Sequence, residues 1–211
     1  NSSKNLDGIP KHDFVIVNPP YLATKIDSRF ETSKAGDLYS YFLENIIKSS
    51  KGFISITPQS FTNAGKFASL RKLLLDNFEN LTIYTFDNVP ANIFKGIKFG
   101  SKNSNQANSI RASIVIAREG KGKRRITSLI RWRSSERETL FKSLEKFLSD
   151  VPLTDSYFPK VSKDYKKLYM WVKDFGTLGD MCSSKTTKYS LYVPSAPRYF
   201  IPALKKPVQR A

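Results

Sequence analysis

Cysteine and histidine are almost absent from the 211-residue sequence, which contains one of each, Cys182 and His12. A single cysteine excludes a disulfide framework and a thiolate metal cluster. A single histidine excludes a serine–histidine–aspartate triad, a cysteine–histidine pair and a multi-histidine metal site. We therefore expect chemistry that needs no metal ion, in a protein suited to a reducing cytoplasm.

Long apolar runs are missing as well. No stretch approaches the roughly 18 apolar residues that a membrane span needs, so we expect no membrane partner and a cytoplasmic location. The amino terminus, Asn1 to Lys4, has neither an initiating methionine nor the apolar core of a signal peptide. We interpret the chain as a fragment of a longer protein.

Basic residues outnumber acidic ones by far. Lysine and arginine together number 35, aspartate and glutamate 18, which gives a net charge of +17 and a pI near 9.9. Each phosphate that a cation neutralises releases counterions, so a nucleic acid is the natural partner of such a chain. A highly charged soluble protein without this partner is the alternative.

A short apolar run that stops abruptly organises the chain. Phe14 to Val17 has the composition of a strand that is buried on both faces of a parallel sheet. Pro19 and Pro20 cannot donate to a neighbouring strand and force the chain out of the sheet. Asn18 to Tyr21 should therefore form a rigid loop at the carboxyl end of the strand, where open α/β sheets bind their ligands.

Strand and helix patterns alternate after this loop. We expect strands at 53–58, 81–86, 110–117 and 126–132, the third of these antiparallel, and helices at 37–50, 65–77 and 135–148. The residues from 22 to 36 form a polar loop that either covers a substrate or is a mobile surface connection. This alternation predicts an α/β fold in which the strands at 14–17, 53–58 and 81–86 are parallel.

The Asn18-Pro19-Pro20-Tyr21 segment resembles motif IV of adenine-N6 DNA methyltransferases, and the Gly36–Glu44 segment is similar to these enzymes at the expected distance. By this resemblance, the chain is the catalytic half of a γ-ordered enzyme of the type II or IIG restriction-modification class. The fold would be the C-terminal half of a Rossmann-like, S-adenosylmethionine-dependent methyltransferase sheet, followed by part of a β-rich target-recognition region.

The resemblance implies catalytic roles for Asn18, Pro19, Pro20 and Tyr21. The Asn18 side-chain carbonyl and the Pro19 main-chain carbonyl would accept the two amino hydrogens of adenine, and the Tyr21 ring would stack on the base. The base would have to be flipped out of double-stranded DNA. A proline turn with a chance asparagine is the alternative.

Two further stretches are candidates for contacts with DNA. Phe94 corresponds by position to a loop phenylalanine that stacks on the flipped base in the adenine enzymes, and with Lys95 it forms the candidate substrate-binding pair. Phe94 could equally anchor a long loop. The glycine- and cation-rich segment 119–125 either contacts phosphates or is a solvated turn.

The methyl donor site is largely missing from the sequence. In the enzymes that the chain resembles, S-adenosylmethionine is bound upstream of the Asn-Pro-Pro-Tyr segment, but only twelve residues precede Asp13 here, and Gly8 is their only glycine. Of the cofactor-binding residues we expect only Asn18 in this chain. The other half would come from the same or another polypeptide, and a restriction subunit or domain is a possible further partner.

These considerations predict three regions: a catalytic half at 1–133, a helical connector at 134–175 and the start of a recognition region at 176–211. The isolated chain should be inactive, bind S-adenosylmethionine negligibly and self-associate through the apolar edge formed by residues 14–17. Two alternatives stay open. The chain could be a non-catalytic DNA-binding fragment, or it could belong to an enzyme that methylates a protein glutamine or an RNA amine.

Overall fold

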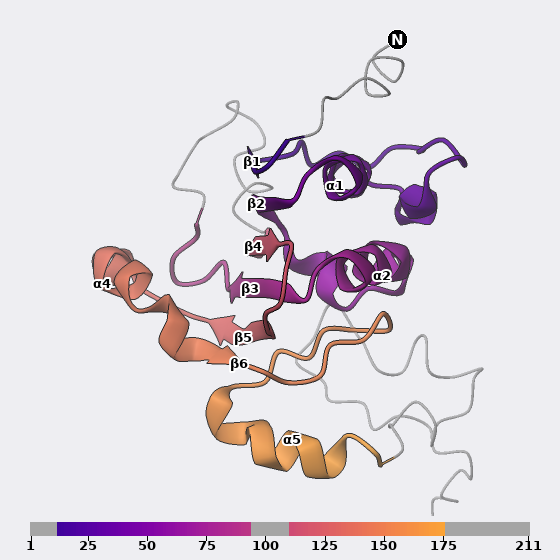
Figure 1. Cartoon of the computed structure of the whole chain (residues 1–211). Coiled ribbons are helices and arrows are strands. Elements are labelled where there is room, and N and C mark those ends of the chain that lie inside the picture. The colour runs from indigo at the N-terminus through magenta and orange to yellow at the C-terminus, as the bar shows by residue number, and fades with distance from the viewer. Residues whose placement is uncertain (1–11, 94–109, 176–211) are drawn as a thin grey trace, which may run out of the picture. The chain divides into compact units, whose positions relative to one another are not determined.

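The computed structural model describes residues 12–93 and 110–175 (Figure 1). The chain divides into two units, Asn1–Lys166 and Lys167–Ala211. The first contains a six-stranded sheet with helices, and the second contains most of the short helix α5 (Lys166–Val172). Phe94, Lys95 and the predicted recognition region at 176–211 lie outside the described residues.

The sheet is mixed, with the strand order β1-β2-β4-β3-β5-β6. β1 is parallel to β2 and β3 is parallel to β5, whereas β4 is antiparallel to both of its neighbours and β6 is antiparallel to β5. The prediction of an antiparallel fourth strand is confirmed. The strands β1, β2 and β3 run in the same direction, as predicted, but β3 does not pair with β2 because β4 lies between them. The strands are β1 (Val15–Val17), β2 (Gly52–Pro58), β3 (Asn80–Phe86), β4 (Ala112–Arg118), β5 (Arg124–Ile130) and β6 (Leu148–Ser149).

Helices lie on both faces of the sheet. α1 (Leu38–Ser49) and α2 (Ala68–Asn77) cover one face, and α4 (Arg137–Lys142) lies on the other (Figure 1). The single helix expected at 135–148 is wrong, because the helix ends at Ser143 and the chain continues as the 3₁₀ helix η6 (Leu144–Phe147). The Ser143 hydroxyl donates to the Thr139 carbonyl at 2.9 Å, and such local bonding competes with a regular helix.

The sheet face under α1 and α2 is buried along β2, β3 and β4. Phe53 of β2 pairs with Ala117 of β4, and both side chains are buried. The Phe53 ring also meets the ring of Phe78, which follows α2, with 5.7 Å between the ring centroids. Further along the same pair of strands the buried residues are polar, and the hydroxyls of Thr57 and Ser113 bond at 3.1 Å. Mutual hydrogen bonding offsets the cost of burying these hydroxyls.

The opposite face holds a second hydrophobic core centred on β3, β5 and α4. Its buried members include Tyr84, Phe86, Trp132, Leu140, Leu144 and Leu148, with Ile56, Ile114 and Ile116 packed against them. The rings of Phe86 and Phe141 are stacked at 6.0 Å. This core fixes the β5–α4 segment on the far half of the sheet.

β1 forms one edge of the sheet in the described part of the chain. Its only strand partner there is β2, and the Ile16 side chain is 79% exposed while that of Phe14 is 42% exposed. The prediction that this strand is buried on both faces is therefore wrong. The prediction that residues 14–17 form an apolar edge is confirmed for β1.

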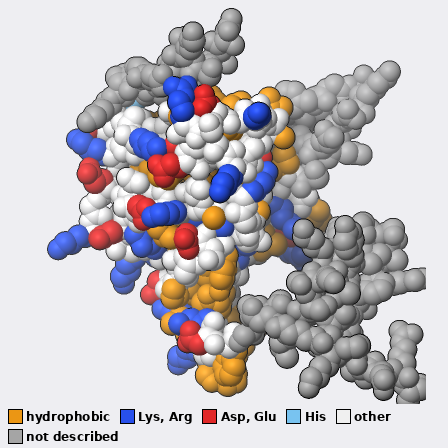
Figure 2. Space-filling model, turned by 90° about the vertical axis from the view of Figure 1, so that its right-hand side faces the viewer, with side chains coloured by type: hydrophobic (Ala, Val, Ile, Leu, Met, Phe, Trp, Pro, Cys, Tyr) orange, Lys and Arg blue, Asp and Glu red, His pale blue; other side chains and the backbone are white. Residues whose placement is uncertain are grey.

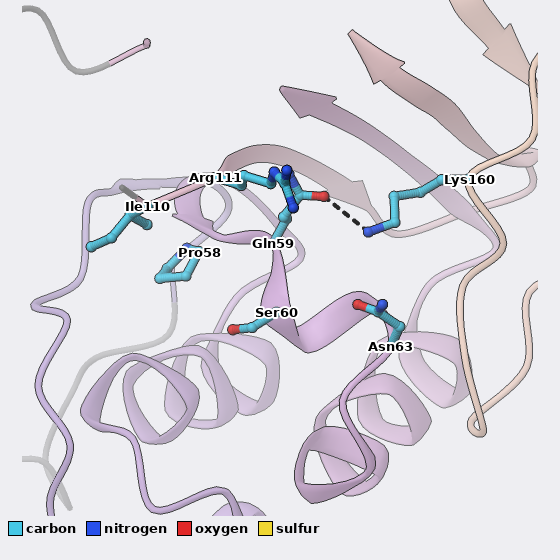
Figure 3. Close-up of a pocket in the computed structure, with 7 residues that line it drawn as sticks. All are labelled: Pro58, Gln59, Ser60, Asn63, Ile110, Arg111 and Lys160. Carbon is cyan, nitrogen blue, oxygen red and sulfur yellow. Dashed lines mark hydrogen bonds between the residues drawn. The ribbon is translucent and has the colours of Figure 1, made fainter. Parts of the chain in front are cut away.

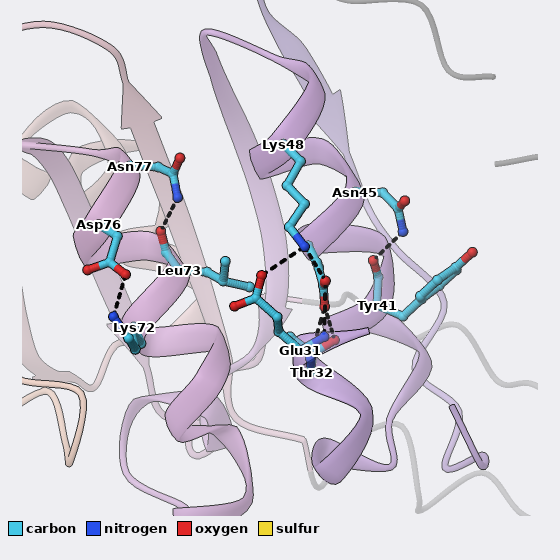
Figure 4. A network of polar contacts seen from close by, with 10 residues as sticks. Glu31, Thr32, Tyr41, Asn45, Lys48, Lys72, Leu73, Asp76 and Asn77 are labelled. Atoms are coloured by element: carbon cyan, nitrogen blue, oxygen red, sulfur yellow. Dashed lines mark hydrogen bonds and ion pairs between the residues drawn. The ribbon is translucent and has the colours of Figure 1, made fainter. Parts of the chain in front are cut away.

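The polar loop before α1 is held in place by a buried carboxylate. Glu44 of α1 is completely buried and accepts hydrogen bonds from the main-chain N–H of Thr32 at 2.9 Å, from the Thr32 hydroxyl at 2.8 Å and from Lys48 at 2.6 Å (Figure 4). Lys48 also pairs with Glu31 at 2.9 Å. These bonds fasten the 3₁₀ helix η2 (Glu31–Ala35) to α1, which makes the loop a fixed part of the fold.

Arg71 of α2 is completely buried, although arginine is a charged residue. Its guanidinium group donates to the main-chain carbonyls of Phe61 at 2.6 Å, Ala64 at 2.9 Å, Asp155 at 2.6 Å and Ser156 at 2.7 Å. Burial lowers the pKa of Arg71, but a guanidinium remains charged under all folding conditions. The residue thus connects α2 to the turn that precedes it and to the distant segment at 155–156.

Charges of both signs alternate on the face that carries α1 and α2 (Figure 2). Several are paired, such as Lys72 with Asp76 at 2.7 Å on α2. This face therefore presents no broad field of one sign that would attract a polyanion. In the described part of the chain, no helix combines the length and apolar character required to cross a membrane.

We expect the exposed β1 edge to drive self-association of the 211-residue chain. Replacing Ile16 with lysine places a charge on that edge, which disfavours the addition of another strand. Light scattering should show a lower average mass for Ile16→Lys than for the unmodified chain. The matched control is Leu22→Lys, because Leu22 is also exposed but lies outside the strand. Equal association of all three proteins would contradict this role of the edge.

We expect Glu44 to make the stability of the fold depend on pH. Burial opposes ionisation of Glu44, but the bonds from Lys48 and Thr32 outweigh it, so its pKa lies below the ordinary value of 4.5. This stabilisation is complete above pH 4.5 and is lost as the pH falls through the lowered pKa. Glu44→Gln should reduce the free energy of unfolding in urea at neutral pH by about 2–3 kcal/mol. It should also remove this part of the pH dependence, whereas Glu79→Gln, at an exposed position, should change neither.

Candidate active site

The candidate loop lies where two parallel strands end side by side. Val17 of β1 is in register with Ser55 of β2, so the residues that follow both strands emerge at the same end of the sheet, where the parallel strands have their carboxyl ends. Asn18 is exposed, whereas the next residue, Pro19, is buried. The buried proline anchors the loop and leaves the asparagine side chain accessible at the carboxyl end of β1.

The Tyr21 hydroxyl joins the loop to β2. Its oxygen lies 2.7 Å from Asn18 Oδ1 and 2.6 Å from the main-chain carbonyl oxygen of Ile56. The single hydroxyl proton is shared between these two acceptors. Burial raises the pKa of Tyr21 to about 12, so the hydroxyl is protonated at neutral pH and acts as the donor. Tyr21 thus fixes both its own ring and the amide of Asn18.

Asn18 keeps the ability to bind a ligand. An amide oxygen has two lone pairs, and the contact with Tyr21 occupies only one of them. Because the side chain is exposed, a second donor from outside the protein can reach the remaining lone pair. The geometry suits recognition of an N–H group next to an aromatic ring.

An aromatic contact continues from the loop to the turn after β2. The Tyr21 ring meets the Tyr39 ring edge-on with 6.2 Å between centroids, and the Tyr39 hydroxyl lies 3.2 Å from Ser60 Oγ. Burial raises the pKa of Tyr39. Ser60 belongs to the 3₁₀ helix η3 (Gln59–Thr62), which follows β2 directly. The loop after β1 and the turn after β2 are therefore coupled through the buried Tyr39 side chain.

A pocket of about 400 Å³ lies beside this turn (Figure 3). Two cations take part in its lining: Arg111, which precedes β4, and Lys160, which comes from a segment far along the chain. Lys160 Nζ donates to Gln59 Oε1 at 2.9 Å, and the Gln59 amide nitrogen donates to the Phe86 carbonyl at 2.9 Å. The lining residues are Pro58, Gln59, Ser60, Asn63, Ile110, Arg111 and Lys160.

A buried carboxylate positions the arginine of this pocket. Asp87, directly after β3, accepts hydrogen bonds from Arg111 Nε at 2.9 Å and from Arg131 Nε at 2.7 Å. Burial raises the pKa of Asp87, but these two bonds outweigh that effect and the net shift is downward. Asp87 is therefore ionised at neutral pH and holds both arginines at the same edge of the sheet.

The structure brings together part of what the sequence predicted. Asn18, Pro19, Pro20 and Tyr21 lie in one loop at the carboxyl end of β1. The cation-rich turn at 119–123 follows β4, whose last residue pairs with Gly52 and Asn80 at the amino ends of β2 and β3. This turn therefore lies at the opposite edge of the sheet from Asn18.

Arg124, next to that turn, has a structural role. Its guanidinium group donates to the carbonyls of Leu75 and Phe78 at the end of α2. Such bonds satisfy carbonyls that have no partner within the helix.

Gln59, Arg111 and Lys160 were not predicted as site residues. Gln59 follows the proline that ends β2, so the sequence places it at the carboxyl end of that strand. No local pattern connects it with Lys160, which is 101 positions away. Only the tertiary fold brings these two residues together.

The described residues do not by themselves form a site that fits S-adenosylmethionine. The pocket beside β2 is lined by cations and amides, and among its described residues no carboxylate is present to bind ribose hydroxyls. A second pocket, beside the loop before α1, contains Asp27, but this carboxylate pairs with Arg29 at 3.2 Å.

Comparison with known sequences gives a match in the part of the chain that carries the candidate loop. Residues 3–94 match the family described as Eco57I restriction-modification methylase. The chain is also 38% identical over 87 residues to the type II methyltransferase M.PstI of Providencia stuartii, covering 37% of this chain and 17% of that protein. The chain therefore spans about one sixth of the length of that curated relative.

Comparison with solved structures gives partial likenesses. The DrdV–DNA complex matches 66% of this chain and 17% of its own, at 15% identity and a TM-score of 0.48. The methyltransferase subunit of a type I restriction-modification system from Streptococcus thermophilus matches 68% of this chain and 34% of its own, at 19% identity and a TM-score of 0.42. In sequence, residues 3–94 are similar to restriction-modification methylases.

Proposed function

We propose that the Asn18–Tyr21 loop is the amino-group acceptor site of a DNA methyltransferase that modifies adenine at N6 within a restriction-modification system. The observation that carries this proposal is the exposed Asn18 amide, held by Tyr21 at the carboxyl end of a strand. The match of residues 3–94 to restriction-modification methylases supports it.

The chemistry requires two acceptors near one nitrogen. The lone pair of an aromatic amino group is delocalised into the ring, so the nitrogen is a poor nucleophile. Acceptance of its two hydrogens by Asn18 Oδ1 and the Pro19 carbonyl favours a tetrahedral nitrogen whose lone pair points away from the ring. The accessible lone pair on Asn18 Oδ1 supports this role. Pro20 keeps the loop extended in this geometry.

Tyr21 provides the surface on which the flipped base stacks. Its ring is half-buried and anchored at the hydroxyl to Ile56 of β2, so little side-chain entropy is lost when a base binds. We assign Phe94 to the other face of the base and Lys95 to the neighbouring DNA, both by resemblance. Double-stranded DNA is the substrate, with its target base extruded into the site.

The methyl donor in this proposal is S-adenosylmethionine, which supplies an electrophilic methyl group. Apart from Asn18, its binding residues would come from outside the described ranges, in the same or another polypeptide. We likewise propose the division into a catalytic half at 1–133, a connector at 134–175 and the start of target recognition at 176–211. A restriction subunit or domain is the further partner.

Asn18→Ala should lower methyl transfer by the complete enzyme about 10²–10³-fold, the typical effect of losing one preorganised hydrogen-bonding group. Binding of a DNA duplex should stay within a few-fold, because Asn18 activates the amine and contributes little affinity. Transfer of a tritiated methyl group to a duplex measures the first effect, and fluorescence anisotropy measures the second.

The matched control is Asn77→Ala, an asparagine at the exposed end of α2, which should leave methyl transfer unchanged. Full activity of Asn18→Ala would contradict the proposed site. Duplexes without adenine should accept no methyl group. Methylation of an RNA or of a glutamine peptide in place of DNA would instead favour the alternative substrates, and DNA binding without any transfer would favour a non-catalytic role.

Tyr21→Ala should weaken capture of the flipped base by about 1–3 kcal/mol, because one stacking contact is lost. A duplex with 2-aminopurine at the target position then shows a smaller rise in fluorescence on binding. Tyr21→Phe is the matched control, since it removes the bonds to Asn18 and Ile56 but keeps the ring, and it should retain most of the rise. Phe94→Ala should behave like Tyr21→Ala. An unchanged rise with Phe94→Ala would make Phe94 a loop anchor.

A further inference from the structure

The pocket beside β2 has an excess of positive charge. Arg111 and Lys160 line it, and no carboxylate is present among its described lining residues. The nearest carboxylate that contacts either cation is that of Asp87, which lies behind Arg111 and is shared with Arg131. Two arginines thus share one buried carboxylate, and among the described residues Lys160 contacts none. The field inside the pocket favours an anion.

Lys160 is the unusual member of this group. The side chain is half-buried, and in the described part of the chain its ammonium group bonds only to the neutral amide oxygen of Gln59, at 2.9 Å. Burial and the nearby charge of Arg111 both lower the pKa of Lys160. Partial burial of a lysine without a carboxylate partner is costly. A bound anion between Lys160 and Arg111 would offset both the burial of the ammonium charge and its repulsion by Arg111.

Both cations are held in place before any ligand arrives. Asp87 fixes Arg111 through Nε, and within the described residues the two terminal nitrogens of the guanidinium group remain available as donors at the pocket that Arg111 lines. Gln59 fixes Lys160 and is itself tied to the main chain of Phe86 (Figure 3). Ser60 and Asn63 add a hydroxyl and an amide to the same lining. This set of donors matches the oxygens of a phosphate group.

We propose that this pocket binds a backbone phosphate of the DNA strand that carries the target base. The proposal rests on the proposed function, because the position of the pocket gives it this role. Ser60 lines the pocket and contacts Tyr39, whose ring meets Tyr21, so the phosphate site adjoins the base site. A phosphate held there fixes the strand next to the flipped nucleotide without reading its sequence.

The test measures binding of a labelled duplex by the 211-residue chain as a function of salt. Lys160→Met removes the charge and keeps the apolar stem. It should weaken binding equally for all duplex sequences and reduce the slope of log K against log salt by about 1. Between 50 and 200 mM salt, its affinity should fall about three- to fourfold less than that of the unmodified chain. Lys160→Arg keeps the charge and should restore the slope.

The matched control is Lys121→Met, because Lys121 is exposed in the turn at the opposite edge of the sheet. It should leave the salt slope unchanged. Urea unfolding checks that each variant is folded, and a Lys160→Met variant that fails to fold is replaced by Lys160→Gln. An unchanged slope in a folded Lys160 variant, or an equal loss in Lys121→Met, would overturn the proposal.

Titration with inorganic phosphate tests whether the pocket binds a free phosphate ion or a phosphate of DNA. Weak competition by inorganic phosphate for the duplex, absent in Lys160→Met, is expected. Binding of inorganic phosphate without any binding of DNA would overturn the assignment to a DNA phosphate. The result is independent of methyl transfer. If the Lys160 variants change the salt slope while Asn18→Ala keeps full activity, the phosphate site stands and the proposed catalytic role of Asn18 falls.

Discussion

The candidate site depends on one buried cation, Arg71 of α2. Its guanidinium group donates to the carbonyls of Phe61 and Ala64, in the turn that follows β2, and to those of residues 155 and 156. The first segment carries the amides of the pocket, and the second leads to Lys160. A single side chain thus bonds to four main-chain carbonyls in two segments. Together with the Phe158 N–H, which donates to the Thr62 carbonyl at 2.6 Å, it joins the two walls of the pocket.

Much of the fold was accessible from local sequence patterns, for physical reasons. Prolines end β1 and β2 by removing main-chain donors, so both strand ends and the loop containing Asn18 could be located from sequence. Helices α1 and α2 follow from apolar periodicity. The same periodicity contained a signal for Arg71 that was missed. Arg71 comes four positions after Phe67 and three before Leu74, both of which are buried, and therefore lies on the same helical face.

Other features depend on contacts between distant segments. The run from Phe14 to Val17 has the composition of a buried strand, but Ile16 is exposed because its side chain lies on the face of β1 that none of the described elements covers. Nothing local marks Lys160 as a neighbour of Gln59. Pairing rules would not have placed β4 between β2 and β3, since consecutive strands are neighbours more often than not. Composition indicated a polyanionic partner, but only the fold shows that Arg111 and Lys160 line the same pocket.

The position of β4 has a consequence for how the chain reaches its native state. β2 and β3 are made early, yet each pairs with residues 112–118 and not with the other. Until that later segment arrives, both strands expose unpaired main-chain groups during synthesis. Contacts between such distant segments slow folding, because a long loop must close before they stabilise the sheet. The middle of the sheet therefore cannot form before residues 112–118 have been made, and β4 joins β2 to β3 when it does.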